Sequence, residues 1–313
     1  MSSIPPRPTV PVAVGILCRP DGTLLFASRP AGKPWAGYWE FPGGKIETGE
    51  SPRHALEREL EEELGIRVVD ASPWIVLRHD YQHTRVELHC FRVHGWQGEP
   101  QSREGQQLSW QSPLAPALEP LLPANHRLLR AWQLPSLIGI SHTEGRGDAF
   151  LAALDRALQR GLKWVHIREN QLPDIEDFAR KAVRLTHRHH ALVSINGDAA
   201  LAHRVQADGL HLSAAALASL DARPDFPLIG ASCHDAAELD RAEQFGCDYA
   251  LLSPVLPTAS HPGAATLGWH GFATLIAGRS LPVYALGGME PGLLATAQQH
   301  GAQGIALLRG LWQ

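Results

Sequence analysis

The sequence predicts two α/β domains, the second of them a closed (β/α)8 barrel. The chain has 313 residues, about twice the length of a typical domain. Near residue 135 its pattern changes from strands around one acidic helix to short apolar runs that alternate with helical stretches. Such alternation is typical of right-handed βαβ units on a parallel sheet, and about eight units suggest a barrel. An open doubly wound sheet is the alternative architecture.

Composition narrows the class of protein. Hydrophobic residues make up 44% and charged residues 19%, which is ordinary for a globular protein. The net charge of −4 does not indicate nucleic-acid binding. No run of apolar residues approaches the roughly 20 that a membrane span needs. The start of the chain lacks a signal-peptide core. We therefore expect a cytoplasmic protein whose four cysteines, which have no metal-binding spacing, are incidental thiols: Cys18, Cys90, Cys233 and Cys247.

The first domain is expected to cover residues 1–134. It opens with a strand within 10–20, a turn at Asp21-Gly22 and a second strand within 23–30, which together read as a hairpin. After a loop, apolar residues at helical spacing predict a helix over 51–64 that Gly65 ends. Further strands follow at 74–81 and 84–96, then an irregular Pro-rich stretch and a short closing helix over 126–132.

The second domain is expected to cover residues 135–313. Helical patterns separate most of its apolar runs. The expected strands are 137–141, 164–168, 191–195, 209–212, 227–232, 249–253, 282–288 and 304–308.

The acidic helix carries the clearest chemical signal. Glu59, Glu62 and Glu63 stand at i, i+3 and i+4, so their carboxylates share one face and repel one another. A divalent cation would neutralise such a face, and oxygen ligands favour Mg²⁺ or Mn²⁺, which also hold substrate phosphates. From charge alone, a solvated acidic face is the alternative. Arg58 lies beside the cluster, where its guanidinium can orient a carboxylate.

The same segment fits a nine-position signature, G-x5-E-x7-R-E-U-x-E-E-x-G-U, and so resembles the Nudix hydrolases. The matching residues are Gly44, Glu50, Arg58, Glu59, Leu60, Glu62, Glu63, Gly65 and Ile66. The resemblance implies an α/β/α sandwich with a mixed sheet. It also implies metal-activated water that cleaves nucleoside diphosphates linked to another group. The implied metal ligands are Glu59, Glu62 and Glu63, with Gly43 beside them and Glu50 assisting.

Flanking segments resemble the MutT-type 8-oxo-dGTP diphosphatases, enzymes tied to DNA replication and repair. They are VAVGIL, SRPAGKPWAGYWEFPGGKIETGE, GEPQSREGQQLSW and LPANHRLL. The resemblance implies that Arg29 serves the triphosphate, that Glu104 lies near the metals, and that Phe41 and Asn125 serve the base. An amide both donates and accepts, so Asn125 can pair with the O6 and N7–H edge of 8-oxoguanine. The alternatives are a helix cap for Asn125 and a plain core position for Phe41.

The second domain resembles the thiamine phosphate synthase and TenI family over about residues 137–310. The segments that carry this resemblance are WVHIREN, SINGD, ADGLHLS, GASCHDAAEL, DYALLSPVLPTASHPG and YALGGMEPG. It implies a (β/α)8 barrel in which Gly287 and Gly288 offer backbone N–H groups to a phosphate. His234 matches the acid–base histidine of thiazole tautomerases, and the alternative is a hydrogen-bonded histidine at a strand end. Arg168 has two readings, anion binding or a surface ion pair.

Departures from the synthase pattern argue against synthase activity. His166, Asn170 and His261 replace the expected glutamine and lysines, and Ser213–Ala216 reads SAAA where a magnesium-binding acid is expected. An enzyme that ionises a pyrimidine pyrophosphate needs that metal and those cations.

These observations lead to one main expectation. A Mg²⁺- or Mn²⁺-dependent diphosphatase hydrolyses a damaged purine nucleoside triphosphate, with Glu50, Glu62 or Glu104 as the general base. The expected partners are this small nucleotide and a thiazole or other phosphate ligand in the barrel, without nucleic acid or membrane. Two alternatives stay open: the first domain acts on a thiamine-pathway pyrophosphate, or the barrel is a non-catalytic binding module.

Overall fold

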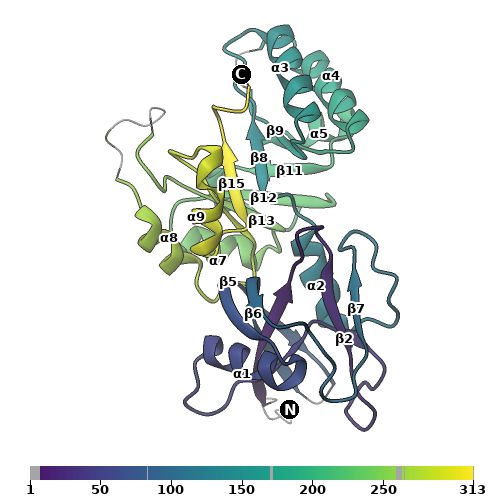
Figure 1. The fold of residues 1–313 in the computed structure, drawn as a ribbon. Helices are drawn as coiled ribbons and strands as arrows, with labels where there is room; N and C mark the ends of the chain where they lie inside the picture. Colours follow the sequence, from purple (N-terminus) through teal and green to yellow (C-terminus); the bar gives the residue numbers. More distant parts are fainter. Residues whose placement is uncertain (1–7, 83, 170–171, 259–262, 264, 313) are drawn as a thin grey trace. The chain divides into compact units, whose positions relative to one another are not determined.

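The computed structural model describes residues 8–82, 84–169, 172–258, 263 and 265–312 (Figure 1). The chain forms two compact units, one of Met1–Leu134 with Ala277–Ser280 and the other of Pro135–Ile276 with Leu281–Gln313. Of the residues singled out above, Asn170 and His261 lie outside the described residues.

The first unit contains a mixed sheet between two helices. Its four strands run in the order β4-β1-β6-β5, with β1 parallel to β6 and antiparallel to β4. A second sheet has the order β3-β2-β7. The elements are β1 (Thr9–Leu17), β2 (Leu24–Ser28), β3 (Trp39–Glu40), β4 (Gly43–Lys45), α1 (Pro52–Leu64), β5 (Arg67–Asp80), β6 (Arg85–Gln97), β7 (Leu108–Gln111) and α2 (Pro123–Trp132).

Alternation along β1 explains why a helix covers each face of the sheet. Ala13 and Leu17 belong to the apolar cluster of α1, whose buried residues are Ala55, Leu56, Leu60 and Leu64. Val14 and Ile16 belong to the cluster of α2. Successive side chains of a strand point to opposite faces. This arrangement confirms the expected α/β/α sandwich with a mixed sheet.

The expected hairpin is wrong in its pairing. β1 and β2 lie in different sheets, and between them there is only one isolated bridge, from Cys18 to Leu24. The reason is that β4 and β6 already occupy both edges of β1. The short strands β3, β4 and β7 were not expected, and α2 begins at Pro123, three residues earlier than expected.

The second unit is a closed barrel, which confirms the (β/α)8 architecture over the open sheet. Its parallel strands follow the order β10-β11-β12-β13-β14-β15-β8-β9. The strands are β8 (Leu137–Ile140), β9 (Trp164–Ile167), β10 (Leu192–Asn196), β11 (Gly209–Leu212), β12 (Leu228–Cys233), β13 (Tyr249–Leu252), β14 (Val283–Ala285) and β15 (Gly304–Leu307).

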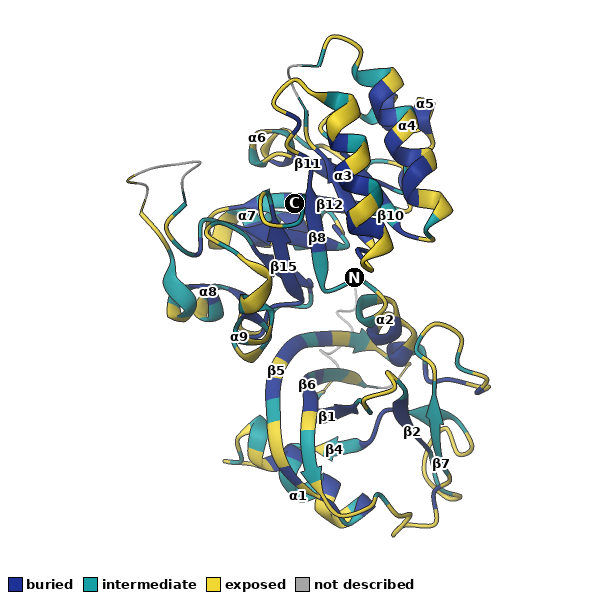
Figure 2. Cartoon of the chain, turned by 45° about the horizontal axis from the view of Figure 1, so that its top comes forward, coloured by how far each residue is buried: buried dark blue, intermediate teal, exposed yellow. Residues whose placement is uncertain are grey.

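Helices cover the outside of this barrel. They are α3 (Gly147–Gln159), α4 (Ile175–Arg188), α5 (Ala199–Val205), α6 (Ala214–Ala218), α7 (Ala236–Gln244), α8 (Gly268–Ile276), the 3₁₀ turn η1 (Pro291–Leu293) and α9 (Leu294–Gln299). Of these, α6 and α8 were not expected. Figure 2 shows buried strands and helices whose outer sides are exposed, the burial pattern of an amphipathic helix on a core.

Large aromatic side chains fill one layer of the barrel interior. Trp164, Tyr249 and Tyr284 are fully buried, with ring centroids 4.6–5.9 Å apart in edge-to-face contacts. A Cβ at Gly230 would lie 2.0 Å from the Tyr249 ring, so the glycine makes room for the phenol. The interior is therefore a packed core.

Two findings bear on the class of protein. Within the described residues, no helix is long and apolar enough to cross a membrane. The four cysteines are free thiols, three of them buried and Cys18 partly so.

Candidate functional site

Helix α1 presents its carboxylates next to the glycine strand β4. Ser51 caps the helix by accepting from the His54 amide, and Gly65 ends it with φ of 69°. Because the leucine face of α1 packs on the sheet, Glu59 lies against Gly44, with a side chain only 16% exposed. A Cβ at Gly44 would lie 2.1 Å from the Glu59 carboxyl carbon. The glycine therefore lets the strand approach the carboxylate.

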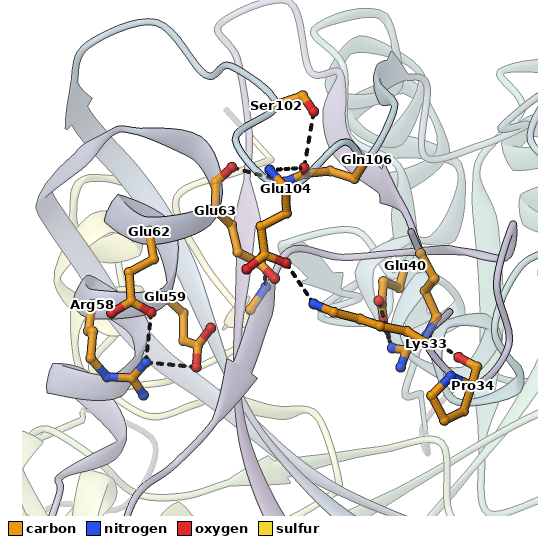
Figure 3. A network of polar contacts seen from close by, with 12 residues as sticks. Lys33, Pro34, Glu40, Arg58, Glu59, Glu62, Glu63, Ser102, Glu104 and Gln106 are labelled. Atoms are coloured by element: carbon orange, nitrogen blue, oxygen red, sulfur yellow. Dashed lines mark hydrogen bonds and ion pairs between the residues drawn. The ribbon is translucent and has the colours of Figure 1, made fainter. Parts of the chain in front are cut away.

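Arg58 connects three of the predicted carboxylates. Its guanidinium donates to Glu59 at 2.9 Å and to Glu62 at 3.1 Å (Figure 3). It also donates to both oxygens of Glu50 at 3.0 Å. It also donates to the Lys45 carbonyl at 3.0 Å. The guanidinium holds the pKa of Glu50 below its usual value, and the Glu50 carboxylate raises the pKa of Arg58. Arg58 is thus a positioning residue for the acidic face.

Glu63 is the most perturbed carboxylate of the cluster. Burial, helped by the charges of Glu59 and Glu104, raises its pKa to about 7. The Gly43 amide donates to it at 3.3 Å. Burial also raises the pKa of Glu59. Burial disfavours the charged form of a carboxylate, and a bound cation would favour it.

Glu104 reaches the same place from a distant loop. Its carboxylate accepts from Lys33 at 2.6 Å. The Gln106 side chain fixes the loop, because its oxygen accepts from the Glu104 amide and its nitrogen donates to the Glu63 carbonyl. Lys33 and Gln106 were not predicted, although both lie inside segments that carry the MutT resemblance.

Arg29 is engaged by another residue that the sequence did not single out. Its Nη1 donates to both oxygens of Glu40 at 2.7 and 2.8 Å, and its Nε donates to the Pro34 carbonyl at 2.7 Å. Burial raises the pKa of Glu40 in spite of this partner.

These residues border one cleft of about 960 Å³ in the first unit. Of the predicted residues, the lining includes Arg29, Phe41, Gly43, Gly44, Glu59, Glu63, Glu104 and Asn125. It does not include Glu50, Arg58 or Glu62, and Glu62 is 57% exposed on the outer side of Arg58. The structure thus brings the first group of predicted residues together around the cleft. Glu50, Arg58 and Glu62 lie outside its lining.

Asn125 and Phe41 lie on the wall of this cleft. Asn125 is only 4% exposed and stands inside α2, whose N-cap is Leu122, so the asparagine does not cap the helix. No hydrogen bond to another described residue involves its side-chain amide, and no buried side-chain nitrogen or oxygen among these residues lacks a partner, so the amide atoms are open to the cleft. Phe41 stacks on Phe26 with ring centroids 4.6 Å apart, so it serves the core and the cleft together.

The donor set of the cleft suits a hard divalent cation. Glu59, Glu63 and Glu104 offer oxygen ligands only, the type that Mg²⁺ and Mn²⁺ take. Within the described part of the chain, no three acidic, histidine or cysteine side chains are already arranged around one point. Lys33 is paired with Glu104, and Arg58 orients Glu59. The residues fit the ion once the Lys33 ammonium leaves Glu104.

In the second unit, His234 directly follows β12, the fifth strand of the barrel in chain order. Its Nδ1 lies 2.9 Å from a Glu238 oxygen, and the ring is 51% exposed. Gly287 and Gly288 follow β14 with φ of 92° and 68°. A side chain at Gly288 would overlap the Pro257 carbonyl at 2.6 Å, so close packing requires this glycine.

The barrel departs from a synthase in its side chains as well. Ser213 caps α6 by accepting from the Ala216 amide, and the alanines that follow carry no carboxylate. His166 is buried with Nδ1 3.0 Å from the Ser194 hydroxyl, and burial lowers its pKa to about 3. Arg168 is exposed and forms no ion pair with any residue that the structure describes.

Comparison with known proteins gives two non-overlapping matches. A family model described as NUDIX domain matches residues 13–131, and one described as thiamine monophosphate synthase matches residues 137–311. A putative thiamine-phosphate synthase 2 of Aquifex aeolicus is 34% identical over 179 residues, covering 56% of this chain and 96% of that protein. A CTP pyrophosphohydrolase of Escherichia coli is 40% identical over 119 residues, covering 38% of this chain and 88% of that protein. An 8-oxo-dGTP diphosphatase of Haemophilus influenzae is 37% identical over 120 residues, covering 38% of this chain and 88% of that protein.

Proposed function

The chain belongs to the Nudix family over residues 13–131 and to the thiamine monophosphate synthase family over residues 137–311, and we propose that its first unit hydrolyses 8-oxo-dGTP and related oxidised purine nucleoside triphosphates. The products are the nucleoside monophosphate and pyrophosphate. The observation that carries this substrate is the Asn125 amide, nearly buried in the cleft wall and without a partner among the described residues.

The amide is complementary to an oxidised purine. Its N–H can donate to O6 of 8-oxoguanine, and its oxygen can accept from N7–H. Ordinary guanine has an acceptor at N7. The Asn125 oxygen is also an acceptor, so no hydrogen bond can form between the two atoms. A base that covers this amide without matching its donor and its acceptor would leave them unsatisfied at a cost in free energy, so the matching base is favoured.

The carboxylates of the cleft would carry out the hydrolysis of the phosphate chain. Glu59 and Glu63 would hold Mg²⁺ or Mn²⁺ with Glu104 beside them, and the ion would stabilise charge on the phosphate oxygens and activate water. Arg58, which lies outside the cleft lining, fixes the orientation of Glu59 through a hydrogen bond. Of the three candidate general bases, only Glu104 lines the cleft, whereas Glu50 and Glu62 are bound to Arg58. We therefore favour Glu104 as the group that takes the proton from water.

A pyrimidine triphosphate is the second candidate substrate, since the CTP pyrophosphohydrolase is a relative at 40% identity. The test compares kcat/KM of the full chain for 8-oxo-dGTP, dGTP, CTP and thiamine diphosphate with Mg²⁺. We expect 8-oxo-dGTP to exceed dGTP and CTP by about tenfold or more, the worth of one good bidentate pair. A higher value for CTP would reassign the substrate, and a higher value for thiamine diphosphate would support the thiamine-pathway alternative.

For the barrel, we propose binding of a small phosphorylated ligand, such as a thiazole phosphate, without thiamine phosphate synthase activity. The support is the SAAA segment, which offers no carboxylate for magnesium, and the Gly287-Gly288 turn after β14. Any surviving chemistry would be proton transfer through His234, which Glu238 orients. Calorimetry with thiazole phosphate tests the binding. Thiamine phosphate formed by the full chain from the two synthase substrates would refute the loss of activity, and tautomerisation undiminished in His234→Ala would refute the role of that histidine.

A further inference from the structure

Lys33 lies in the cleft and is paired with Glu104, next to the carboxylates that would bind a metal ion. We propose that Lys33 is a phosphate-binding residue of the cleft, and that its ammonium opposes divalent-cation binding until a nucleotide draws it away from Glu104. The inference rests on the proposed nucleotide-hydrolysing function, which it deepens by naming a residue for the phosphate chain.

The geometry of the ion pair is the first argument. Lys33 Nζ lies 2.6 Å from Glu104 Oε2, and the two side chains are 49% and 40% exposed. Both residues line the cleft that also contains Glu59 and Glu63 (Figure 3). A half-exposed pair of this kind contributes little net free energy, so exchanging its partner is easy. The flexible lysine stem allows the ammonium to move from one anion to another.

The charge balance of the cleft is the second argument. Among the residues that the structure describes, four carboxylates line it, from Glu40, Glu59, Glu63 and Glu104, against three basic side chains, from Arg29, Lys33 and Lys45. The Arg29 guanidinium is held by Glu40 and by the Pro34 carbonyl. Lys33 is instead paired with Glu104, which lines the cleft together with Glu59 and Glu63.

The consequence is an exchange of ions. With a divalent cation bound to the carboxylate cluster, the Lys33 ammonium would be repelled and would feel less negative charge from its partner. A triphosphate that enters with the metal offers new anionic oxygens, and a charge-assisted hydrogen bond from Lys33 to one of them replaces the bond to Glu104. Lys33 therefore weakens metal binding to the free protein and strengthens nucleotide binding.

These two effects have opposite signs, which gives a sharp test on the full chain. Lys33→Met should lower the Kd for Mn²⁺, measured by calorimetry without nucleotide, by about threefold, because a nearby cation is removed. The same variant should raise KM for 8-oxo-dGTP by about tenfold or more, with kcat changed less, because a charged hydrogen bond to phosphate is lost. Lys33→Arg should restore most of the KM.

The matched control is Lys181→Met. Lys181 forms an ion pair of the same length with Asp177, 2.6 Å, at similar exposures of 45% and 48%, in the second unit. We expect no change in either constant. A Lys33→Met protein that binds both Mn²⁺ and nucleotide less tightly would show a merely structural residue, and an unchanged KM would show an ion-pair partner without a phosphate role. Either result overturns the proposal.

Failure of the proposed function can be told apart from failure of this inference. If the wild-type chain hydrolyses no nucleoside triphosphate, the proposed function fails. The Mn²⁺ titration and the binding of Mn²⁺-tripolyphosphate need no turnover and no base, so they still decide the role of Lys33. Tripolyphosphate that binds wild type and Lys33→Met equally would overturn the inference by itself.

Discussion

Arg58 and Glu50 form a two-bond ion pair, in which Nε and Nη2 each donate to one carboxylate oxygen at 3.0 Å. The pair joins the loop before α1 to the helix itself, and the remaining nitrogen of the fork reaches Glu59. Because one planar group satisfies all these acceptors, its orientation sets the position of a carboxylate in the cleft.

Replacement of Arg58 by lysine should therefore reduce activity although the charge is kept. A single ammonium cannot hold Glu50 with two bonds and Glu59 with a third. We expect Arg58→Lys to lower kcat by about tenfold or more, in the range lost when positioning is relaxed by a fraction of an ångström. The control is Arg53→Lys on the same helix, where Arg53 pairs with Glu57 at 2.7 Å outside the cleft. Equal activity of the two variants would remove the positioning role.

Two cleft carboxylates should be essential for the metal. Glu59→Gln and Glu63→Gln keep the shape of the side chain but remove a charged oxygen ligand. Each should reduce kcat about a hundredfold or more, equivalent to about 3 kcal/mol of transition-state stabilisation, and should weaken Mn²⁺ binding. Glu61→Gln on the same helix, exposed and outside the cleft, should behave as wild type. Near-normal turnover in both cleft variants would exclude them as metal ligands.

The raised pKa of Glu63 predicts how the metal-free protein responds to pH. The unfolded chain loses this proton near 4.5, whereas the folded protein keeps it until about 7. Between these values the folded state binds more protons than the unfolded state, so its stability falls as pH rises and levels off above 7. We expect Glu63→Gln to gain stability over wild type across this window, by about 1–3 kcal/mol at pH 8.

Thermal unfolding in the presence of a chelator checks this expectation. Tm of wild type and Glu63→Gln is measured from pH 4.5 to 8.5, and the difference in favour of the variant should grow with pH. A difference that stays constant over the whole range would show that Glu63 ionises at its ordinary pKa. Saturating Mn²⁺ should reverse the order, because the metal binds the wild-type carboxylate.

Features with a fixed local period were predictable from the sequence. The spacing of Glu59, Glu62 and Glu63 placed them on one helix, and the alternation of apolar runs with helical stretches predicted a barrel that the structure closes. The pairing of β1 was not predictable from Asp21-Gly22, because a turn signal shows only that the chain reverses. Which strands lie beside β1 depends on β4 and β6, which are distant in sequence.

The polar network of the cleft was only partly predictable for the same reason. Lys33 and Glu104 are 71 positions apart, and nothing in the local pattern of either residue indicates the other. The signature also gave Glu62 the same weight as Glu59, although only Glu59 lines the cleft. A one-dimensional motif does not reveal which way Arg58 will draw each carboxylate.

The approach of β4 to the helix gives a prediction about shape alone. Gly44→Ala adds a Cβ that would lie 2.1 Å from the Glu59 carboxyl carbon, so the carboxylate must move. We expect a loss of activity of about tenfold or more with the fold retained. Gly292→Ala is the control, because nothing lies within 4 Å of its added Cβ. Full activity of Gly44→Ala would show that Glu59 can act from a different position.

The preference for an oxidised base should depend on Asn125. Asn125→Ala removes the donor and the acceptor from the cleft wall, so the distinction between N7–H and N7 disappears. The ratio of kcat/KM for 8-oxo-dGTP to that for dGTP should fall by about tenfold or more, the value of a bidentate pair at 1–3 kcal/mol. Mn²⁺ affinity should stay at the wild-type value, because Asn125 lies on α2 and the candidate metal ligands lie on α1 and on the loop of Glu104. An unchanged ratio in a variant with normal Tm would show that Asn125 only packs in the fold and does not determine the preference for an oxidised purine.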